Sequence, residues 1–152
     1  MTVGAALWGG IAGAFVMAVV YAGFLGLRLT RLDLLRFEGG LVAHERTGMG
    51  YLYGAVVQLV WLALLALAYR AIFQQIHAAT YVGWGALIGL ATGVVFALLL
   101  PVLAVANRNV RAGDQETPRF AGIGYGTWTP AALLVAFAVY GTWVGIFLVP
   151  GR

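Results

Sequence analysis

The chain has 152 residues, of which 62% are hydrophobic and 9% are charged. A soluble globular domain has about 45–50% apolar and roughly 25% charged residues, so this composition excludes a soluble enzyme, a nucleic-acid-binding domain and a disordered chain. Nine arginines outnumber five acidic residues, an excess that reports topology in a membrane protein, and the lack of cysteine excludes disulfides and thiolate metal sites.

The first predicted element is a membrane-spanning helix at residues 5–27. Residues 1–27 carry no charge, and about 20 apolar residues are enough to cross roughly 30 Å of hydrocarbon. No basic region precedes this segment, which favours a spanning helix over a signal peptide. Gly9 and Gly13 lie four residues apart and predict a close helix contact.

An amphipathic segment at about 28–38 is predicted next, lying in the membrane interface. Leucines and Phe37 alternate there with charged residues, and Gly39-Gly40 is expected to end the segment. Three of its arginines are expected to contact lipid headgroups or a partner: Arg28, Arg31 and Arg36.

His44, Glu45 and Arg46 follow the amphipathic segment. His44 is the one candidate for cofactor binding, and with Glu45 it could carry general acid–base chemistry. The interpretation favoured for this trio is a solvated helix start with local ion pairing. His44 and His77 fall on opposite membrane faces, so one chain cannot hold a haem between them.

Three further spanning helices are predicted at residues 49–71, 81–106 and 130–149, because each range holds one long uncharged stretch. A polar loop at about 107–129 separates the last two, and its Arg108 and Arg111 are expected to contact lipid headgroups or a partner. Glycines spaced four residues apart predict packing faces on these helices. The closest interface is expected at Gly85, Gly89 and Gly93, in the predicted helix at 81–106. The glycines with this spacing are Gly50, Gly54, Gly85, Gly89, Gly93, Gly141 and Gly145.

The sequence therefore predicts one all-α transmembrane domain over residues 1–152, a polytopic bundle of four helices. Seven arginines fall in the loops after the first and third helices, against Arg70 and Arg152 on the other side. By the positive-inside rule these two loops are cytoplasmic and both termini lie outside, with the protein in a prokaryotic cytoplasmic membrane.

A shared pattern between the first and third helices predicts an internal repeat. Trp8, Gly9 and Gly13 match Trp84, Gly85 and Gly89 at an offset of 76 residues. Each half would hold two helices, which makes this a 2+2 parallel repeat about an axis along the membrane normal.

Ionisable chemistry within the predicted spans is sparse. None of the five carboxylates lies in a span, and no metal-ligand motif is visible. Three intramembrane polar residues remain, namely Gln58, Tyr21 and Thr92. An interhelical hydrogen bond is the favoured role for Gln58.

Several of these motifs together resemble a group of small four-helix prokaryotic membrane proteins of unknown function. The resemblance rests on Gly9-Gly10-Ile-Ala-Gly13, the Leu/Arg stretch, His44, Gly50-Tyr-Leu-Tyr-Gly54 and Val139-Tyr140-Gly141. It implies the fold and carries no activity. Members often have a His shortly before the last Tyr-Gly, where this chain has Phe137, so any site that needs this His is absent.

The favoured hypothesis is a non-catalytic accessory subunit of a larger membrane complex, of the respiratory or photosynthetic electron-transport type. No cofactor of its own is expected, although it could contact lipid, quinone or pigment held by partner subunits. A homo-oligomeric channel or transporter is the first alternative, and requires Gln58, Thr92 and Tyr21 to face one cavity. The second is an interfacial lipid- or quinone-modifying enzyme that uses His44 and Glu45.

Overall fold

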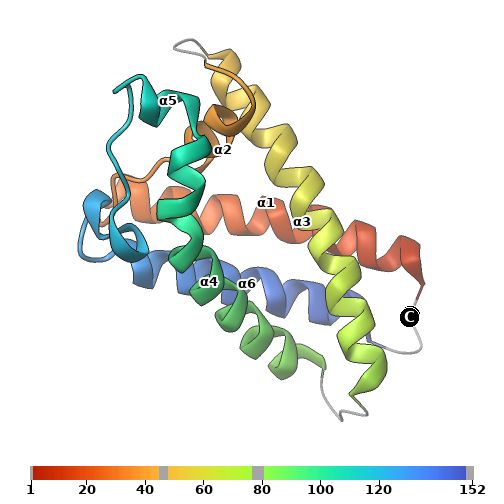
Figure 1. Ribbon diagram of the computed structural model, residues 1–152. Helices are drawn as coiled ribbons and strands as arrows, with labels where there is room; N and C mark the ends of the chain where they lie inside the picture. The colour runs from red at the N-terminus through yellow and green to blue at the C-terminus, as the bar shows by residue number, and fades with distance from the viewer. Residues whose placement is uncertain (1, 45–47, 77–80, 150–152) are drawn as a thin grey trace. The chain divides into compact units, whose positions relative to one another are not determined.

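The computed structural model describes residues 2–44, 48–76 and 81–149, and these residues form helices and connecting segments without strands. Figure 1 shows the elements along the chain. Their order is α1 (Val3–Gly26), α2 (Leu34–Val42), α3 (Met49–Gln75), α4 (Tyr81–Ala106), α5 (Arg108–Arg111), the 3₁₀ helix η1 (Phe120–Tyr125) and α6 (Thr129–Phe147).

Four helices, α1, α3, α4 and α6, are long and apolar enough to cross a membrane. The all-helical prediction with four such helices is confirmed. At about 1.5 Å of rise per residue, even the 19 residues of α6 reach the thickness of a hydrocarbon core. The described part of these helices holds no Asp or Glu. The 2+2 repeat stays a prediction.

The chain divides into two compact units, which are described separately. Unit 1 comprises Met1–Tyr21, Leu59–Gly93 and Leu134–Arg152, and unit 2 comprises Ala22–Gln58 and Val94–Leu133. Unit 1 therefore contains parts of the four long helices, whereas α2, α5 and η1 all belong to unit 2.

Helices in unit 1 approach one another at glycines. A Cβ atom added to Gly85 or Gly89 of α4 would overlap carbonyl groups of α6 and lie 2.9 Å from the carbonyl carbon of Gly141 or Phe137. Gly10 of α1 also lies close to α3, with a hypothetical Cβ 2.8 Å from Cβ of Ala66 and 2.9 Å from Cα of Ala63. Small residues thus bring these helix backbones into direct van der Waals contact.

Unit 2 contains the tightest of these glycine contacts, between α2 and the first turns of α3. A Cβ on Gly54 would overlap the carbonyl oxygen of Leu35 and lie 2.5 Å from its carbonyl carbon. The prediction that Gly85, Gly89 and Gly93 form the closest interface of the four-helix bundle stays a prediction, because α2 is not one of the four long helices. Here α2 lays its own backbone against α3, a contact that the spacing of glycines in the long helices does not reveal.

The amphipathic segment differs from its prediction at both ends. Helix α2 begins after Asp33, whose carboxylate accepts a hydrogen bond from the backbone N–H of Arg36 at 3.1 Å and so caps the helix. Gly39 and Gly40 lie inside α2 and do not end it. Neither position has room for a side chain: a Cβ on Gly39 would overlap the backbone of Gly50, and a Cβ on Gly40 would overlap the side chain of Asn107.

The predicted polar loop at 107–129 contains two short helices, α5 and η1. Asn107 caps α5, accepting hydrogen bonds from the N–H groups of Asn109 and Val110 at 2.9 and 3.1 Å. Within η1, Gly122 (φ 80°) packs against side chains of Leu100 and Thr129, which ties this segment to α4 and α6 inside unit 2.

Candidate functional site

Buried polar side chains of the described residues concentrate in unit 2. Six such side chains are less than 5% exposed, and all six belong to this unit: Thr30, Glu38, Gln58, Asn107, Asn109 and Thr129. Burying a polar group costs free energy unless it is hydrogen-bonded, so a concentration of this kind marks the part of a membrane protein where structure or function requires polarity.

Asn107 joins α2 to α5. Its side-chain N–H group donates a hydrogen bond to the carbonyl oxygen of Phe37 at 2.7 Å, while its side-chain oxygen caps α5. The same amide lies against Gly40. One fully buried side chain therefore holds two short helices that come from loops about 70 residues apart.

Arg31 joins the segment before α2 to η1. Its backbone N–H donates to the carbonyl oxygen of Tyr125 at 2.8 Å, and its Nη2 donates to the carbonyl oxygen of Gly124 at 3.2 Å. Its Nη1 forms an ion pair with Glu116 at 3.1 Å. Thr30, the preceding residue, adds a buried hydroxyl–hydroxyl hydrogen bond to Thr129 at 2.8 Å.

Tyr125, the last residue of η1, also belongs to this network. Its hydroxyl donates a hydrogen bond to the backbone carbonyl of Glu116. Burial, and secondarily the negative charge of Glu116, raise the pKa of Tyr125 to about 12. The phenol therefore stays protonated and remains a donor through the physiological range.

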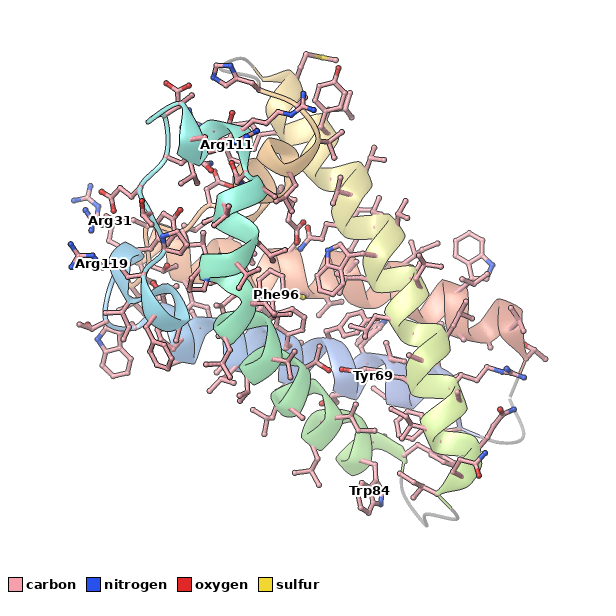
Figure 2. All side chains as sticks on the ribbon, in the orientation of Figure 1. Arg31, Tyr69, Trp84, Phe96, Arg111 and Arg119 are labelled. Atoms are coloured by element: carbon pink, nitrogen blue, oxygen red, sulfur yellow. The ribbon has the colours of Figure 1, made fainter. Side chains whose placement is uncertain are left out.

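Arg31 and Arg119 line one open pocket of about 590 Å³, together with Glu116, Thr117, Ile123 and Gly124. We refer to these six residues as the Arg31–Arg119 pocket. In the view of Figure 2 the Arg31 and Arg119 side chains extend to the same side of this part of unit 2, whereas Arg111 on α5 lies apart from them. A second pocket of about 170 Å³ shares Arg31 and Glu116 but is more acidic, since it adds Asp33 and Asp114 to the lining.

His44 forms a hydrogen-bonded pair with Asp114, with 2.7 Å between Nε2 and the carboxylate. The pair joins the segment after α2 to the segment after α5. Glu45 and Arg46, the predicted partners of His44, lie outside the described residues, as do His77 and Arg152. The described residues hold no cluster of three or more metal-ligating side chains.

The three predicted intramembrane polar residues fall in different units. Tyr21 and Thr92 belong to unit 1 and Gln58 to unit 2, and all three are at least partly buried. The Thr92 hydroxyl donates to the carbonyl of Ile88 at 2.8 Å and lies 2.8 Å from the hydroxyl of Tyr69. Its hydrogen-bonding capacity is therefore used within the helices.

The remaining predicted site residues are placed as follows. Arg28, Arg108 and Arg111 are exposed in unit 2, and Arg36 is partly buried there and lines the more acidic pocket. Phe137, at the position where the resembling proteins often have His, is fully buried with its ring 5.8 Å from that of Trp61. The predicted glycines lie at helix contacts, seven of them in unit 1 and two, Gly50 and Gly54, in unit 2.

Sequence reasoning did not identify Glu38, Asn107, Arg119 or Tyr125 as important residues. A usable signal existed for Asn107, since asparagine is a preferred helix cap and here follows directly on a long apolar helix. Glu38 gave no such signal, because a carboxylate among arginines reads as solvated, yet it is 2% exposed.

The chain matches no protein-family model, no curated protein and no solved structure, so its function is argued from the residues described above.

Proposed function

We propose that this chain is a non-catalytic structural subunit of a larger membrane protein complex, of the respiratory or photosynthetic electron-transport type. The observation that supports this proposal most directly is that two buried tyrosine hydroxyls of unit 1 form hydrogen bonds between its helices. Tyr69 bonds to Thr92 and Tyr140 donates to the carbonyl of Leu62, so these two buried phenols are engaged with neighbouring helices.

An aromatic cluster surrounds these two hydrogen bonds. The rings of Tyr69 and Tyr140 lie 5.8 Å apart at a steep angle, and Phe73 packs edge-on against Tyr69. Arg70 is the one formally charged side chain in the described part of unit 1. Interlocked aromatic rings and direct backbone contacts favour a rigid scaffold over a moving or reacting site.

The arginines of unit 2 support a cytoplasmic position for the segments between α1 and α3 and between α4 and α6. Six arginines and four acidic residues lie in the described part of this unit. With those segments inside, both termini lie outside in the prokaryotic cytoplasmic membrane that we propose. A single cysteine introduced at exposed Gly113, probed with a membrane-impermeant thiol reagent in intact cells, tests this orientation.

The channel alternative has less support. It needs Thr92 to line a polar path, and the hydroxyl of Thr92 is bonded to Tyr69 and Ile88. A catalytic role for His44 also has less support, because its pair with Asp114 is partly solvent-exposed and joins two loop segments.

The test is extraction of the tagged chain from its native membrane in a mild detergent, followed by a native gel and an absorption spectrum of the band. A large band with haem, chlorin or flavin absorbance would support the proposal, and a large colourless band would support only the subunit role. A small colourless band at all detergent concentrations would contradict it.

A substitution at Gly89 is not a suitable probe of partner binding. Its hypothetical Cβ lies 2.9 Å from the carbonyl carbon of Phe137, so Gly89→Leu breaks the α4–α6 contact inside unit 1. Partner binding is better probed at residues that are exposed on the surface of the long helices. Ala91 is exposed on the same helix as Gly89, so Ala91→Leu leaves the α4–α6 contact intact and is the variant to compare with Gly89→Leu.

A further inference from the structure

We propose that the Arg31–Arg119 pocket binds the phosphate group of an anionic phospholipid. Arg31 and Arg119, which are 88 positions apart in the chain, both line this pocket (Figure 2). Glu116 offsets one of the two positive charges and leaves the other for an anionic ligand, and planar guanidinium groups match the oxygens of a phosphate. The proposal concerns a ligand site and does not depend on a partner subunit.

Arg31 is positioned before any ligand binds. Its ion pair with Glu116, in which the two side chains are 65% and 54% exposed, and its hydrogen bond to Gly124 restrict the orientation of the guanidinium group. A guanidinium has five N–H donors, so these two contacts leave about three donors for a ligand. A donor group that is already oriented loses less conformational entropy on binding.

Arg119 has no ion-pair partner among the described residues, and its backbone is strained. Its φ of 52° and ψ of −170° lie in a region that is essentially restricted to glycine. Such strain costs about 1–3 kcal/mol in general and concentrates at ligand sites. Glycine would remove the strain but also the guanidinium, which supplies a physical reason for an arginine at this position.

The charge of the pocket favours a phosphodiester. Arg31 and Arg119 are opposed by the single carboxylate of Glu116, which leaves one net positive charge, and the hydroxyl of Thr117 adds a neutral donor. A lipid phosphodiester carries one negative charge, whereas a phosphate monoester carries about −1.5 to −2 near neutral pH. The second negative charge of a monoester or of free phosphate would be repelled by the carboxylate of Glu116, which lines the same pocket.

Exposed apolar side chains of η1 and of the segment that follows it indicate that the ligand is part of a membrane. Phe120, Ile123 and Trp128 are 68%, 47% and 61% exposed, and Ile123 lines the pocket itself. Aromatic residues of this kind favour the headgroup level of a bilayer. Arg31 follows the end of α1 by five residues, and η1 precedes the start of α6 by a few residues, which places the pocket near the ends of two spanning helices.

The experiment measures thermal unfolding of the full chain in a nonionic detergent, by intrinsic tryptophan fluorescence at constant ionic strength. Three probes are titrated separately: short-chain phosphatidylglycerol, short-chain phosphatidylcholine and inorganic phosphate. We expect a saturable rise in Tm with phosphatidylglycerol, because a ligand that binds only the folded state stabilises it. Phosphatidylcholine and inorganic phosphate are expected to produce smaller shifts at equal concentration.

Three variants locate the site. Arg119→Gln is expected to raise the apparent Kd for phosphatidylglycerol by about tenfold, the effect of losing one charge-assisted hydrogen-bonding group. Arg119→Gly is expected to weaken binding equally while raising the Tm measured without lipid, because it relieves the positive φ. Arg70→Gln makes the same change in net charge in unit 1, outside the pocket, and its Kd is expected to equal that of the unmodified chain.

Three results would overturn the proposal. An equal loss of affinity in Arg70→Gln and Arg119→Gln would show that only the overall charge attracts lipid. A shift with inorganic phosphate as large as that with phosphatidylglycerol would show a site for free phosphate, and saturation with phosphatidylcholine at the same Kd would show no preference for an anionic lipid.

Discussion

Gly54→Ala provides a direct test of how α2 is held. Gly54 lies in the first turns of α3, and a Cβ at this position would overlap the carbonyl oxygen of Leu35 and lie 2.5 Å from its carbonyl carbon. Carbon atoms in ordinary contact are about 3.5–4.0 Å apart, so the backbone of α2 must move by about 1 Å or more. No flexible side chain is available to absorb this displacement, because the overlapping atoms belong to backbone.

The expected cost follows from three contributions. Overpacking of a tight contact costs about 1–3 kcal/mol. Displacement of α2 also strains the hydrogen bond from Asn107 to the carbonyl of Phe37, which contributes about 1 kcal/mol. Alanine regains about 1 kcal/mol through its higher helix propensity. The free energy of unfolding should therefore fall by about 1–3 kcal/mol.

Gly23→Ala is the matched control. Gly23 lies in α1 within the same unit, and no atom lies within 4 Å of a Cβ added there. The same chemical change should leave the free energy of unfolding unchanged or raise it by up to about 1 kcal/mol. The two variants thus differ in the sign of their effect.

The assay is equilibrium unfolding in mixed micelles titrated with denaturing detergent, combined with hydrogen exchange of the α2 amides (Leu34–Val42). Gly54→Ala should lose stability and show faster exchange in α2, whereas Gly23→Ala should show neither effect. Unchanged stability and unchanged protection of α2 in Gly54→Ala would refute the packing argument. Equal destabilisation by both variants would show that helix glycines act here through another property.

Three further substitutions have defined outcomes. Thr92→Val removes the hydroxyl that bonds to Tyr69 and should lower the free energy of unfolding by about 0.6 kcal/mol, measured in the same micelles, and a larger loss would contradict a simple interhelical bond. Because the fold raises the pKa of Tyr125 to about 12, its protonated form is favoured, so its contribution to stability is complete below pH 10 and is lost as pH rises from 10 through 12. The absorbance titration of the unmodified chain minus that of Tyr125→Phe should show this transition near pH 12, and a transition at pH 10 would disprove the burial effect. His44→Ala should lower stability by at most about 1 kcal/mol, with a smaller effect at high salt, because its ion pair is partly exposed.

Composition and charge spacing were sufficient to predict the four long helices, since an apolar solvent imposes one simple rule. Backbone groups in hydrocarbon must be satisfied within a helix, so any uncharged stretch of about 20 apolar residues has one stable conformation. Glycine spacing also pointed to positions where helix backbones touch. At Gly85 and Gly89 the spacing identified a real approach to α6, although it did not identify the partner helix.

The segments between the spans were less predictable because their structure depends on distant residues. The alternation of leucine and arginine predicted an amphipathic segment over 28–38, whereas the helix occupies Leu34–Val42. Asp33 sets its start by local capping, which the sequence could have indicated. Its continuation through Gly39 and Gly40 depends on Gly50 and Asn107, which lie beyond the reach of local patterns.

The sequence by itself determined four helices that are long and apolar enough to span a membrane, with the carboxylates outside them, because hydrophobicity and charge are local properties of the chain. Tertiary structure alone decided that Arg31 and Arg119 line one pocket, that Asn107 joins α2 to α5, and that Thr92 bonds to Tyr69. Each of these pairings closes a loop of more than 20 residues. Where the two ends of each loop meet is set by packing and hydrogen bonds formed elsewhere in the same unit, and no local sequence pattern encodes these contacts.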